Sequence, residues 1–413
     1  MSPHGESKIW PVVKLGEVAE LSLGKMLDAK KNRGRPQPYL RNPNVKWLDF
    51  DLSDVRTMRF EEHEDKRYGL LDGDVLICEG GEAGRAAIWD GRVGGMKFQK
   101  AIHRVRCGPR LNNRFLVHRL MADYFSGRLA DYYTGATIKH LTGQDLARYS
   151  FPLPPVAEQR RIAATLDMAD GLRAKRRAAL AKLDTLTQSI FLGMFGDPAT
   201  NPKGWPSMAL GSLAVRFSDG PFGSNLKSEH YTDAGVRVIR LQNIGIGQFL
   251  DADKAFISTL HFTQLKKHEC LPGDILVGTL GDPNLRACVQ PNWLPIALNK
   301  ADCVQIRVDD RVATASYVAA LLNHPATERM AHRLMHGQTR VRISMGHLRC
   351  LQVPVPCLEL QRDFAKRISS VESLAILHRN SLSACDALFA SLQQRAFRGE
   401  LFPSPESSPL AAE

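Results

Sequence analysis

Two stretches of the chain, residues 156–197 and 357–400, repeat apolar side chains every three or four positions and contain no internal proline. This spacing places the apolar residues along one face of an α-helix. The first stripe contains Ile162, Leu166, Ala169, Leu172, Leu180, Leu183, Leu186, Ile190 and Met194, interrupted near Arg173 and Arg176, and the second contains Leu360, Phe364, Ile368, Val371, Leu374, Leu377, Leu382, Cys385, Leu388 and Leu392. About forty helical residues span on the order of 60 Å, more than one small domain covers. We therefore expect the two helices to pair as an antiparallel coiled coil.

The segment before each long helix has a different pattern. Residues 14–152 and 208–354 combine Gly-Asp turns with short runs rich in Val, Ile and Leu. Such runs predict strands joined by long loops, with some helix. Proline-rich segments, PLPP and PVPC, then separate these regions from the helices. The pattern predicts an α+β fold of two similar mixed α/β domains, each followed by a long helix.

The chain is an internal repeat with a shift of about 200 residues. The segment LLDGDVLICEGGEAGRAAIW around Gly73 matches CLPGDILVGTLGDPNLRACV around Gly273, and the same shift places Lys100-Ala101 on Lys300-Ala301. The segments FPLPPVAEQRRI and VPVPCLELQRDF also match, as do KLGEVAEL and ALGSLAVR. We therefore divide the chain into a first domain at 1–155, a central helix at 156–197, a second domain at 198–356, a C-terminal helix at 357–400 and a disordered tail at 401–413.

The composition favours a polyanionic partner. The 413 residues include 55 Lys and Arg against 43 Asp and Glu, a formal net charge of +12. Excess positive charge promotes binding to nucleic acid through counterion release, although net charge alone identifies no site. The eight scattered cysteines contain no C-x-x-C pair, so we expect reduced structural thiols. The sequence shows no secretory signal and no membrane-spanning apolar run, which predicts a cytoplasmic protein.

Motifs for catalysis are missing from the sequence. The chain has no Asn-Pro-Pro-aromatic motif, and CEGGEAGRA lacks the G-x-x-x-x-G-K-[ST] spacing of a phosphate loop. The 13 histidines are dispersed and form neither H-E-x-x-H nor a cysteine-histidine cluster. We expect no catalytic residue, no metal site and no cofactor in this chain.

Four segments resemble the specificity subunits of type I restriction-modification enzymes: LPPVAEQRRI, GDVLICEGGEAGRAAIW, DGPFGSNLKSEHYTDAGVRVIRLQNI and SLQQRAFRGEL. The resemblance covers nearly the whole chain. It implies two target-recognition domains that read a bipartite, asymmetric target in double-stranded DNA, one half-site per domain. It also implies two modification (methyltransferase) subunits and restriction (endonuclease and translocase) subunits as partners. S-adenosylmethionine, ATP and Mg would bind only those partners, so the complex would be a DNA adenine methyltransferase and ATP-dependent endonuclease around a non-catalytic subunit.

The candidate DNA contacts are basic and amide side chains in loop segments, because Arg and Lys bind phosphates while Arg, Asn and Gln read base edges. The first domain supplies Lys25, Lys30, Lys31, Arg33, Arg35, Arg41, Lys100 and Lys139. The second supplies Ser224, Asn225, Lys227, Arg240, Gln242, Asn243, Lys300, Arg340 and Arg342. The resemblance makes the starts of the two helices docking surfaces for partner subunits, with Glu158, Gln159, Arg160, Gln361 and Arg362 as candidates. Each of these side chains could equally belong to ordinary solvated surface.

Two other interpretations fit the same sequence. The chain could be a related DNA-reading subunit of another defence assembly, which its neighbouring partners would reveal. It could also be a protein-protein scaffold that does not bind DNA, for which we expect weak, salt-insensitive DNA binding. If the two domains do read DNA as a specificity subunit, a helical strut of tens of Å would place them roughly one turn of DNA, 34 to 36 Å, apart.

Overall fold

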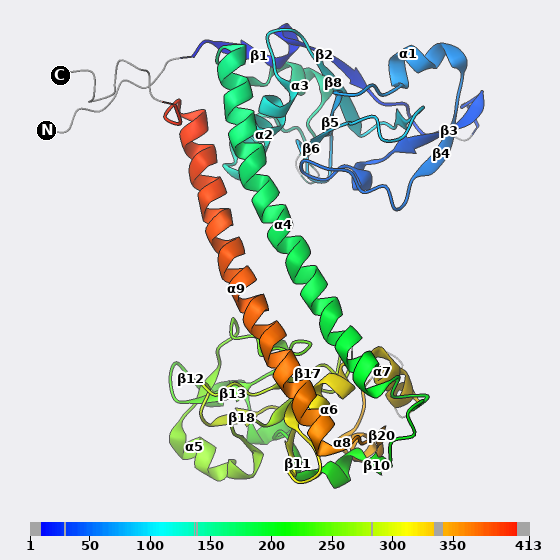
Figure 1. Cartoon of the computed structure of the whole chain (residues 1–413). Coiled ribbons are helices and arrows are strands. Elements are labelled where there is room, and N and C mark those ends of the chain that lie inside the picture. The colour runs from blue at the N-terminus through cyan, green and yellow to red at the C-terminus, as the bar shows by residue number, and fades with distance from the viewer. Residues whose placement is uncertain are drawn as a thin grey trace, which may run out of the picture. The chain divides into compact units, whose positions relative to one another are not determined.

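The computed structural model describes residues 10–28, 30–135, 137, 139–281, 284–333 and 342–402. The chain forms two compact units, one made of Met1–Arg176 with Ser381–Glu413 and the other of Arg177–Asn380 (Figure 1). Each unit contains one mixed domain and one part of each long helix, α4 (Val156–Phe195) and α9 (Leu358–Phe397). Unit 2 is therefore a continuous segment of the chain, whereas unit 1 is formed by the two segments on either side of it.

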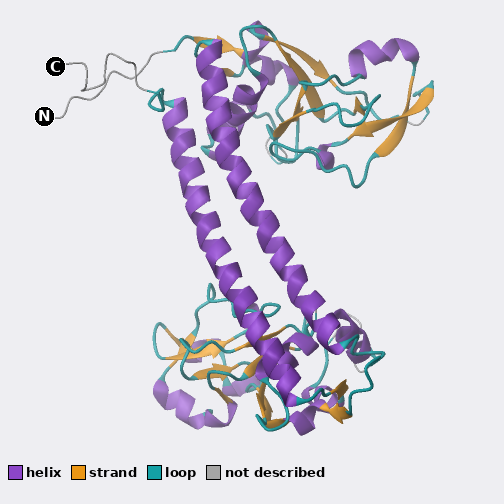
Figure 2. Ribbon diagram, in the orientation of Figure 1, coloured by secondary structure: helices purple, strands orange, loops and turns teal. Residues whose placement is uncertain are grey.

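In unit 1 the domain is built on a four-stranded antiparallel sheet with the order β2-β8-β5-β6, beside a smaller sheet with the order β4-β3-β7 (Figure 2). Its helices and strands are β1 (Val12–Lys14), β2 (Ala19–Leu23), β3 (Arg35–Leu40), β4 (Arg56–Phe60), α1 (Asp65–Tyr68), β5 (Val75–Cys78), β6 (Ala86–Ile88), β7 (Lys97–Phe98), β8 (Ile102–Cys107), α2 (Asn113–Phe125), α3 (Gly143–Arg148) and β9 (Ser150–Pro152). Strand β5 is buried on both faces. Val75 and Ile77 face the core that contains α2, whereas Leu76 and Cys78 face the smaller sheet.

The domain in unit 2 repeats this plan. Its antiparallel sheet has the order β11-β19-β16-β17, and the neighbouring sheet has the order β12-β14-β13-β18-β15. The elements are β10 (Ser207–Ala209), β11 (Ala214–Asp219), β12 (Tyr231–Thr232), β13 (Val236–Ile239), β14 (Phe256–Ile257), α5 (Thr259–Gln264), β15 (Glu269–Cys270), β16 (Ile275–Gly278), β17 (Ala287–Val289), β18 (Ala297–Asn299), β19 (Cys303–Val308), α6 (Ala315–Leu322), α7 (Pro325–His332), α8 (Met345–Cys350) and β20 (Gln352–Pro354). The equivalent order of paired strands confirms two similar mixed domains.

A buried glutamine joins each long helix to the domain before it. The side chain of Gln159 accepts a hydrogen bond from the backbone N–H of Asn112 (2.7 Å) and donates to the carbonyls of Arg110 (2.9 Å) and Pro154 (2.8 Å). Gln361 makes the same three contacts in unit 2, with Thr314, Val312 and Pro356. Both side chains are fully buried. Each glutamine therefore fixes the direction in which its helix leaves the domain.

The two long helices, α4 and α9, pair in an antiparallel orientation. In unit 1, Arg173 of α4 forms an ion pair with Asp386 of α9 (Nε to Oδ1, 2.6 Å), and its guanidinium lies 4.4 Å from the ring centre of Phe389. In unit 2, the rings of Phe191 and Phe364 are 5.8 Å apart. The early part of α4 thus meets the late part of α9, and the late part of α4 meets the early part of α9. The predicted antiparallel helix pair is confirmed.

The predicted apolar stripes were wrong over part of their length. Five of their leucines are between 42% and 59% exposed: Leu172, Leu186, Leu374, Leu377 and Leu388. At Arg173, where the first stripe is interrupted, a charged pair with Asp386 takes the place of an apolar contact across the helices. Strong packing occurs instead where the late part of each helix joins a domain core. Phe195 packs on Tyr317 of unit 2 (4.8 Å between ring centres), and Phe397 packs on Phe115 of unit 1 (5.7 Å).

Among the described residues, no helix combines the length and apolar character needed to cross a membrane.

Candidate nucleic-acid interface

In each domain, one loop packs closely against the turn that precedes a central strand of the antiparallel sheet, β8 in the first domain and β19 in the second. A Cβ on Gly24 would lie 2.2 Å from the carbonyl oxygen of Gln99, and a Cβ on Gly220 would lie 2.1 Å from the carbonyl carbon of Lys300. Only glycine allows this approach. We call the residues that follow, 25–34 and 221–230, the front loops.

The strand ends beside the front loops are also equivalent. The N–H of Glu79, after β5, donates to the carbonyl of Ala101 (2.9 Å), and the N–H of Thr279, after β16, donates to that of Asp302 (3.0 Å). Ala101 and Asp302 both have positive φ, 79° and 68°. We call this arrangement of front loop, strand end and turn the loop edge of each domain.

The loop edge corrects the predicted match of Lys100 with Lys300. Residues of β5 and β16 are related by a shift of 200, whereas the contacts of Gly24 and Gly220 relate Gln99 to Lys300 by a shift of 201. The second domain has one more residue between these points. Lys100 is exposed, whereas Lys300 is half-buried with its ammonium 5.5 Å from the ring centre of Tyr231. The two lysines therefore occupy different places.

In the second domain, several predicted residues gather at the loop edge. The ring centre of Tyr231 lies 5.5 Å from the ammonium of Lys300 and 5.9 Å from the guanidinium of Arg240. Arg342 forms an ion pair with Asp302 (3.1 Å), and its guanidinium lies 5.4 Å from the ring centre of Phe222. The remaining candidates that the structure describes at or near this edge are exposed: Asn225, Lys227 and Gln242. Arg340 and the side chain of Ser224 lie outside the described residues.

Asn243 has a structural role in the loop before β14. Its Oδ1 accepts from the N–H of Arg240 (2.9 Å), and its Nδ2 donates to the carbonyls of Leu250 (2.9 Å) and Asp253 (2.8 Å). The side chain is fully buried. Asn44 makes the same pattern in the first domain, where its Oδ1 accepts from Arg41 (2.8 Å). Asn243 therefore shapes the loop that presents Gln242, and sequence reasoning did not identify Asn44 as its counterpart.

The predicted residues of the first domain divide into two groups. Lys25 is buried, and its ammonium donates to Glu64 (2.5 Å) and to the carbonyl of Arg59 (3.1 Å). Arg41 is also held, by an ion pair with Asp54. The other candidates are exposed: Lys30, Lys31, Arg33, Arg35, Lys100 and Lys139. Lys25 and Arg41 therefore form contacts within the fold, whereas the other six basic side chains are accessible.

The residues predicted to contact partner subunits at the helix starts also fall into an accessible group and a buried group. Arg160 and Arg362 are exposed, and Glu158 is half-buried. Gln159 and Gln361 are fully buried, so in this structure their side chains bind the domain and present no docking surface.

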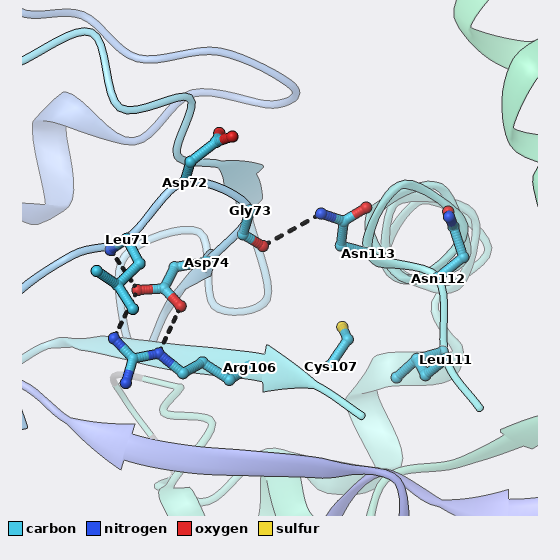
Figure 3. A pocket seen from close by; sticks show the side chains of 9 residues that line it. All are labelled: Leu71, Asp72, Gly73, Asp74, Arg106, Cys107, Leu111, Asn112 and Asn113. Atoms are coloured by element: carbon cyan, nitrogen blue, oxygen red, sulfur yellow. Dashed lines mark hydrogen bonds and ion pairs between the residues drawn. The ribbon is translucent and has the colours of Figure 1, made fainter. Parts of the chain in front are cut away.

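An open cavity of about 400 Å³ in the first domain is lined by polar groups that form hydrogen bonds with one another (Figure 3). Arg106 pairs with the buried Asp74 (2.8 Å), and Asn113 donates to the carbonyl of Gly73 (3.2 Å). Burial raises the pKa of the Cys107 thiol to about 12, so it is protonated at neutral pH. A protonated thiol is a weak nucleophile. The Cys107 thiol is therefore not an activated nucleophile.

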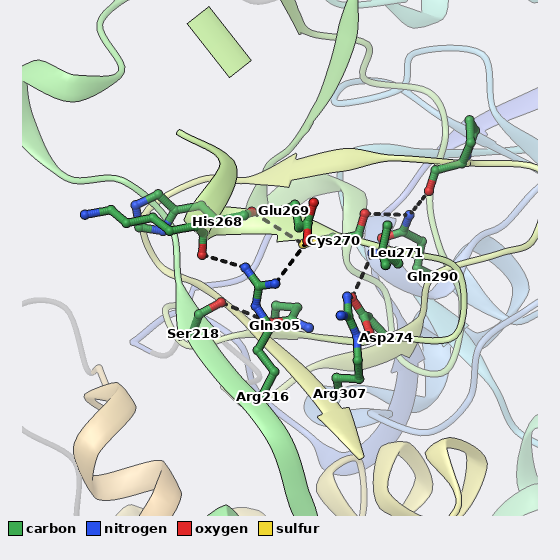
Figure 4. A network of polar contacts seen from close by, with 12 residues as sticks. Arg216, Ser218, His268, Glu269, Cys270, Leu271, Asp274, Gln290, Gln305 and Arg307 are labelled. Atoms are coloured by element: carbon green, nitrogen blue, oxygen red, sulfur yellow. Dashed lines mark hydrogen bonds and ion pairs between the residues drawn. The ribbon is translucent and has the colours of Figure 1, made fainter. Parts of the chain in front are cut away.

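The corresponding region of the second domain is a structural polar network (Figure 4). Arg307 makes two hydrogen bonds to Asp274 (2.7 and 2.9 Å), as Arg106 does to Asp74. Arg216 donates to Glu269 (3.1 Å) and to the carbonyl of Lys267 (2.8 Å). Among the described residues, no group of three or more His, Cys, Asp or Glu side chains is placed to hold a metal ion.

Comparison with known proteins gives consistent matches. Residues 7–182 match the family described as type I restriction modification DNA specificity domain. The specificity subunit of the type I restriction enzyme EcoBI from Escherichia coli is 24% identical over 320 residues, which cover 70% of this chain and 66% of that subunit, just under two thirds. The specificity subunit of the type I restriction enzyme MjaVIII from Methanocaldococcus jannaschii is 20% identical over 400 residues, 90% of this chain and 88% of that subunit.

Two solved structures share the fold. The type I restriction-modification S subunit from M. genitalium superposes with a TM-score of 0.56 at 16% identity, over 98% of both chains. A chain from a study of complex assembly and conformational transition in the type I R-M system superposes with a TM-score of 0.57 at 18% identity, over 97% of this chain and all of that one. The sequence and fold comparisons therefore agree.

Proposed function

We propose that the chain is a type I restriction-modification specificity subunit, the family that residues 7–182 match, and that it recognises a bipartite, asymmetric target in double-stranded DNA, one half-site per domain. The observation that carries this proposal is the loop edge, which occurs twice on the same backbone frame. Its accessible side chains differ between the copies, with Lys30, Lys31 and Lys100 in one and Asn225, Lys227 and Lys300 in the other. A shared frame with different side chains suits two readers of different sequences.

The accessible residues suggest a division of labour on DNA. Flexible lysines bind phosphates as point charges, so Lys30, Lys31 and Lys227 would position the domains without reading sequence. Amide side chains bind base edges in two places at once, so Asn225 and Gln242 are candidates for direct base recognition. The basic side chains of Arg33, Arg35, Lys100, Lys139, Lys300 and Arg342 complete the proposed contact surface.

We also propose that the long helices dock two modification subunits, and that restriction subunits join this complex. Exposed large apolar side chains on the helices support such docking: Met168 and Leu172 in unit 1 are 75% and 48% exposed, and Leu374 and Leu377 in unit 2 are 48% and 59% exposed. Exposed apolar groups are typical of protein interfaces, and the exposed Arg160 and Arg362 lie on the same two helices. S-adenosylmethionine, ATP and Mg would bind the partners, and this chain would catalyse nothing.

Co-expression with the modification subunit in a host without DNA methylation tests the proposal. Mapping of modified bases should reveal one split sequence motif, with methylated adenine in both halves. Replacement of Lys30, Lys31 and Arg33 by alanine should weaken binding to all DNA sequences and reduce the salt slope, by about one for each phosphate that the variant no longer binds. The exposed Lys266 on the second domain serves as a control. A confirmed complex that methylates no defined site would refute the proposal, and weak, salt-insensitive binding would favour a protein scaffold.

A further inference from the structure

Each front loop presents a large apolar side chain at the same structural position, and the first loop also exposes the neighbouring Leu27 (54%). Met26 follows Gly24 by two residues, and Phe222 follows Gly220 by two residues. The close approach of both glycines to the following turn makes these positions equivalent. Met26 is 59% exposed and Phe222 is 43% exposed. Single exposed apolar residues are common on protein surfaces, but the same position in two loops of unlike sequence is a specific coincidence.

The backbone beside both side chains is fixed. In the first domain, the amide of Asn32 donates to the carbonyl of Met26 (3.2 Å), and the backbone of Lys25 bonds to Phe98 and Lys100 (3.2 and 2.7 Å). In the second, the N–H of Asn225 donates to the carbonyl of Phe222 (3.4 Å), and Arg342 stacks over its ring. The loops therefore hold these apolar groups in solvent instead of folding them into the core.

Cations occur on the same loop edges as both apolar groups. Lys30, Lys31 and Lys100 are exposed on the first loop edge, and Lys227 and Arg342 lie on the second. A protein partner would need an acidic, apolar patch that fits two loops of different sequence. Duplex DNA offers phosphates around apolar base surfaces wherever it is bound, and Met and Phe are among the residues that DNA-binding proteins insert against base pairs.

We propose that Met26 and Phe222 are apolar base contacts, one in each half-site, and that they add sequence-dependent affinity which the cations on the same loop edges do not supply. This inference rests on the proposed DNA-reading function. An apolar contact releases no counterions, so it should leave the salt dependence of binding unchanged. It should also act only in the half-site that its own domain reads.

The test uses the complex of the full chain with its modification subunit and a duplex that carries the target mapped by sequencing. Met26→Ala and Phe222→Ala should each weaken target binding about tenfold and leave the salt slope and non-specific binding unchanged. In a panel of single-base changes, each variant should lose discrimination in a different half-site. Val12→Ala and Leu260→Ala, which truncate side chains that are 67% and 77% exposed elsewhere on the two domains, are the matched controls.

Several outcomes would overturn the inference. It fails if both variants bind the target as the wild type does, if specific and non-specific binding fall together, or if both variants affect the same half-site. Thermal unfolding of the variants checks that a loss of binding is not a loss of folding, and Phe222→Leu should restore part of the affinity. If the wild-type complex recognises a split target while the variants are unaffected, only this inference is lost. If the wild type recognises none, the proposed function falls with it.

Discussion

Removal of the buried Gln159 side chain tests how the long helices are attached. In Gln159→Ala, the N–H of Asn112 and the carbonyls of Arg110 and Pro154 lose their shared partner. A buried donor without a partner costs about 1–3 kcal/mol, and the two carbonyls add a smaller amount, so we expect a loss of about 3 kcal/mol in the free energy of unfolding of unit 1. For a unit of this size, that corresponds to a decrease of roughly 6–12 °C in its Tm.

Thermal and urea unfolding followed by circular dichroism measure this loss. Gln159→Met keeps most of the side-chain volume and removes the hydrogen bonds, so it separates the polar contribution from packing. Arg160→Ala changes the neighbouring exposed side chain and should alter stability by less than about 0.5 kcal/mol. Gln361→Ala should destabilise unit 2 by a similar amount, because its contacts are the same. If Gln159→Ala and Arg160→Ala unfold alike, the buried contacts do not stabilise the helix junction.

Three further predictions concern the core, the thiols and pH. Phe195→Ala, which empties a site that is 2% exposed in unit 2, should cost about 3–5 kcal/mol in urea unfolding, whereas the 43% exposed Leu192 should tolerate alanine. A thiol reagent at neutral pH should modify the exposed Cys350 and Cys357 before the buried thiols, since burial raises the pKa of Cys78 and Cys270 and raises that of Cys107, Cys288 and Cys303 to about 12; rapid reaction of all eight in the native state would contradict this burial. Burial lowers the pKa of His103 below its ordinary value near 6.5 despite a hydrogen bond to Leu141, so its neutral form is favoured in the fold. The stability of unit 1 should therefore fall as the pH decreases below about 6.5, and His103→Gln should show a smaller fall in urea midpoint over the same range.

The parts of the fold that depend on local patterns were predictable from the sequence. The repeat, the two long helices and the apolar run that forms β5 all follow from residue patterns, and the structure confirms them. The helix stripes were less predictable. Spacing identifies an apolar face but not its partner, so it did not show that Phe195 and Phe397 pack on domain cores while Leu374 remains exposed.

The candidate site was predictable as loop segments but not residue by residue. Nothing in the segment around Lys25 indicates that its ammonium turns inward, because its partner Glu64 lies 39 residues later. The match of Lys100 to Lys300 also failed, since a single inserted residue is invisible until strand register is known. The roles of the exposed cations remain predictions for binding experiments.

The division of unit 1 between the two ends of the chain affects how the protein is made. During translation, residues up to 176 leave the ribosome about 200 residues before the segment from 381 that completes their core. At roughly 5–20 residues per second, this leaves the first domain with an open apolar face for on the order of 10–40 s, while the continuous unit 2 has all of its parts earlier. Phe389 and Ala396 are buried in the core of unit 1, so a nascent chain that terminates early loses the closing piece of its first-synthesised half. Such fragments should be targets for chaperones and proteases.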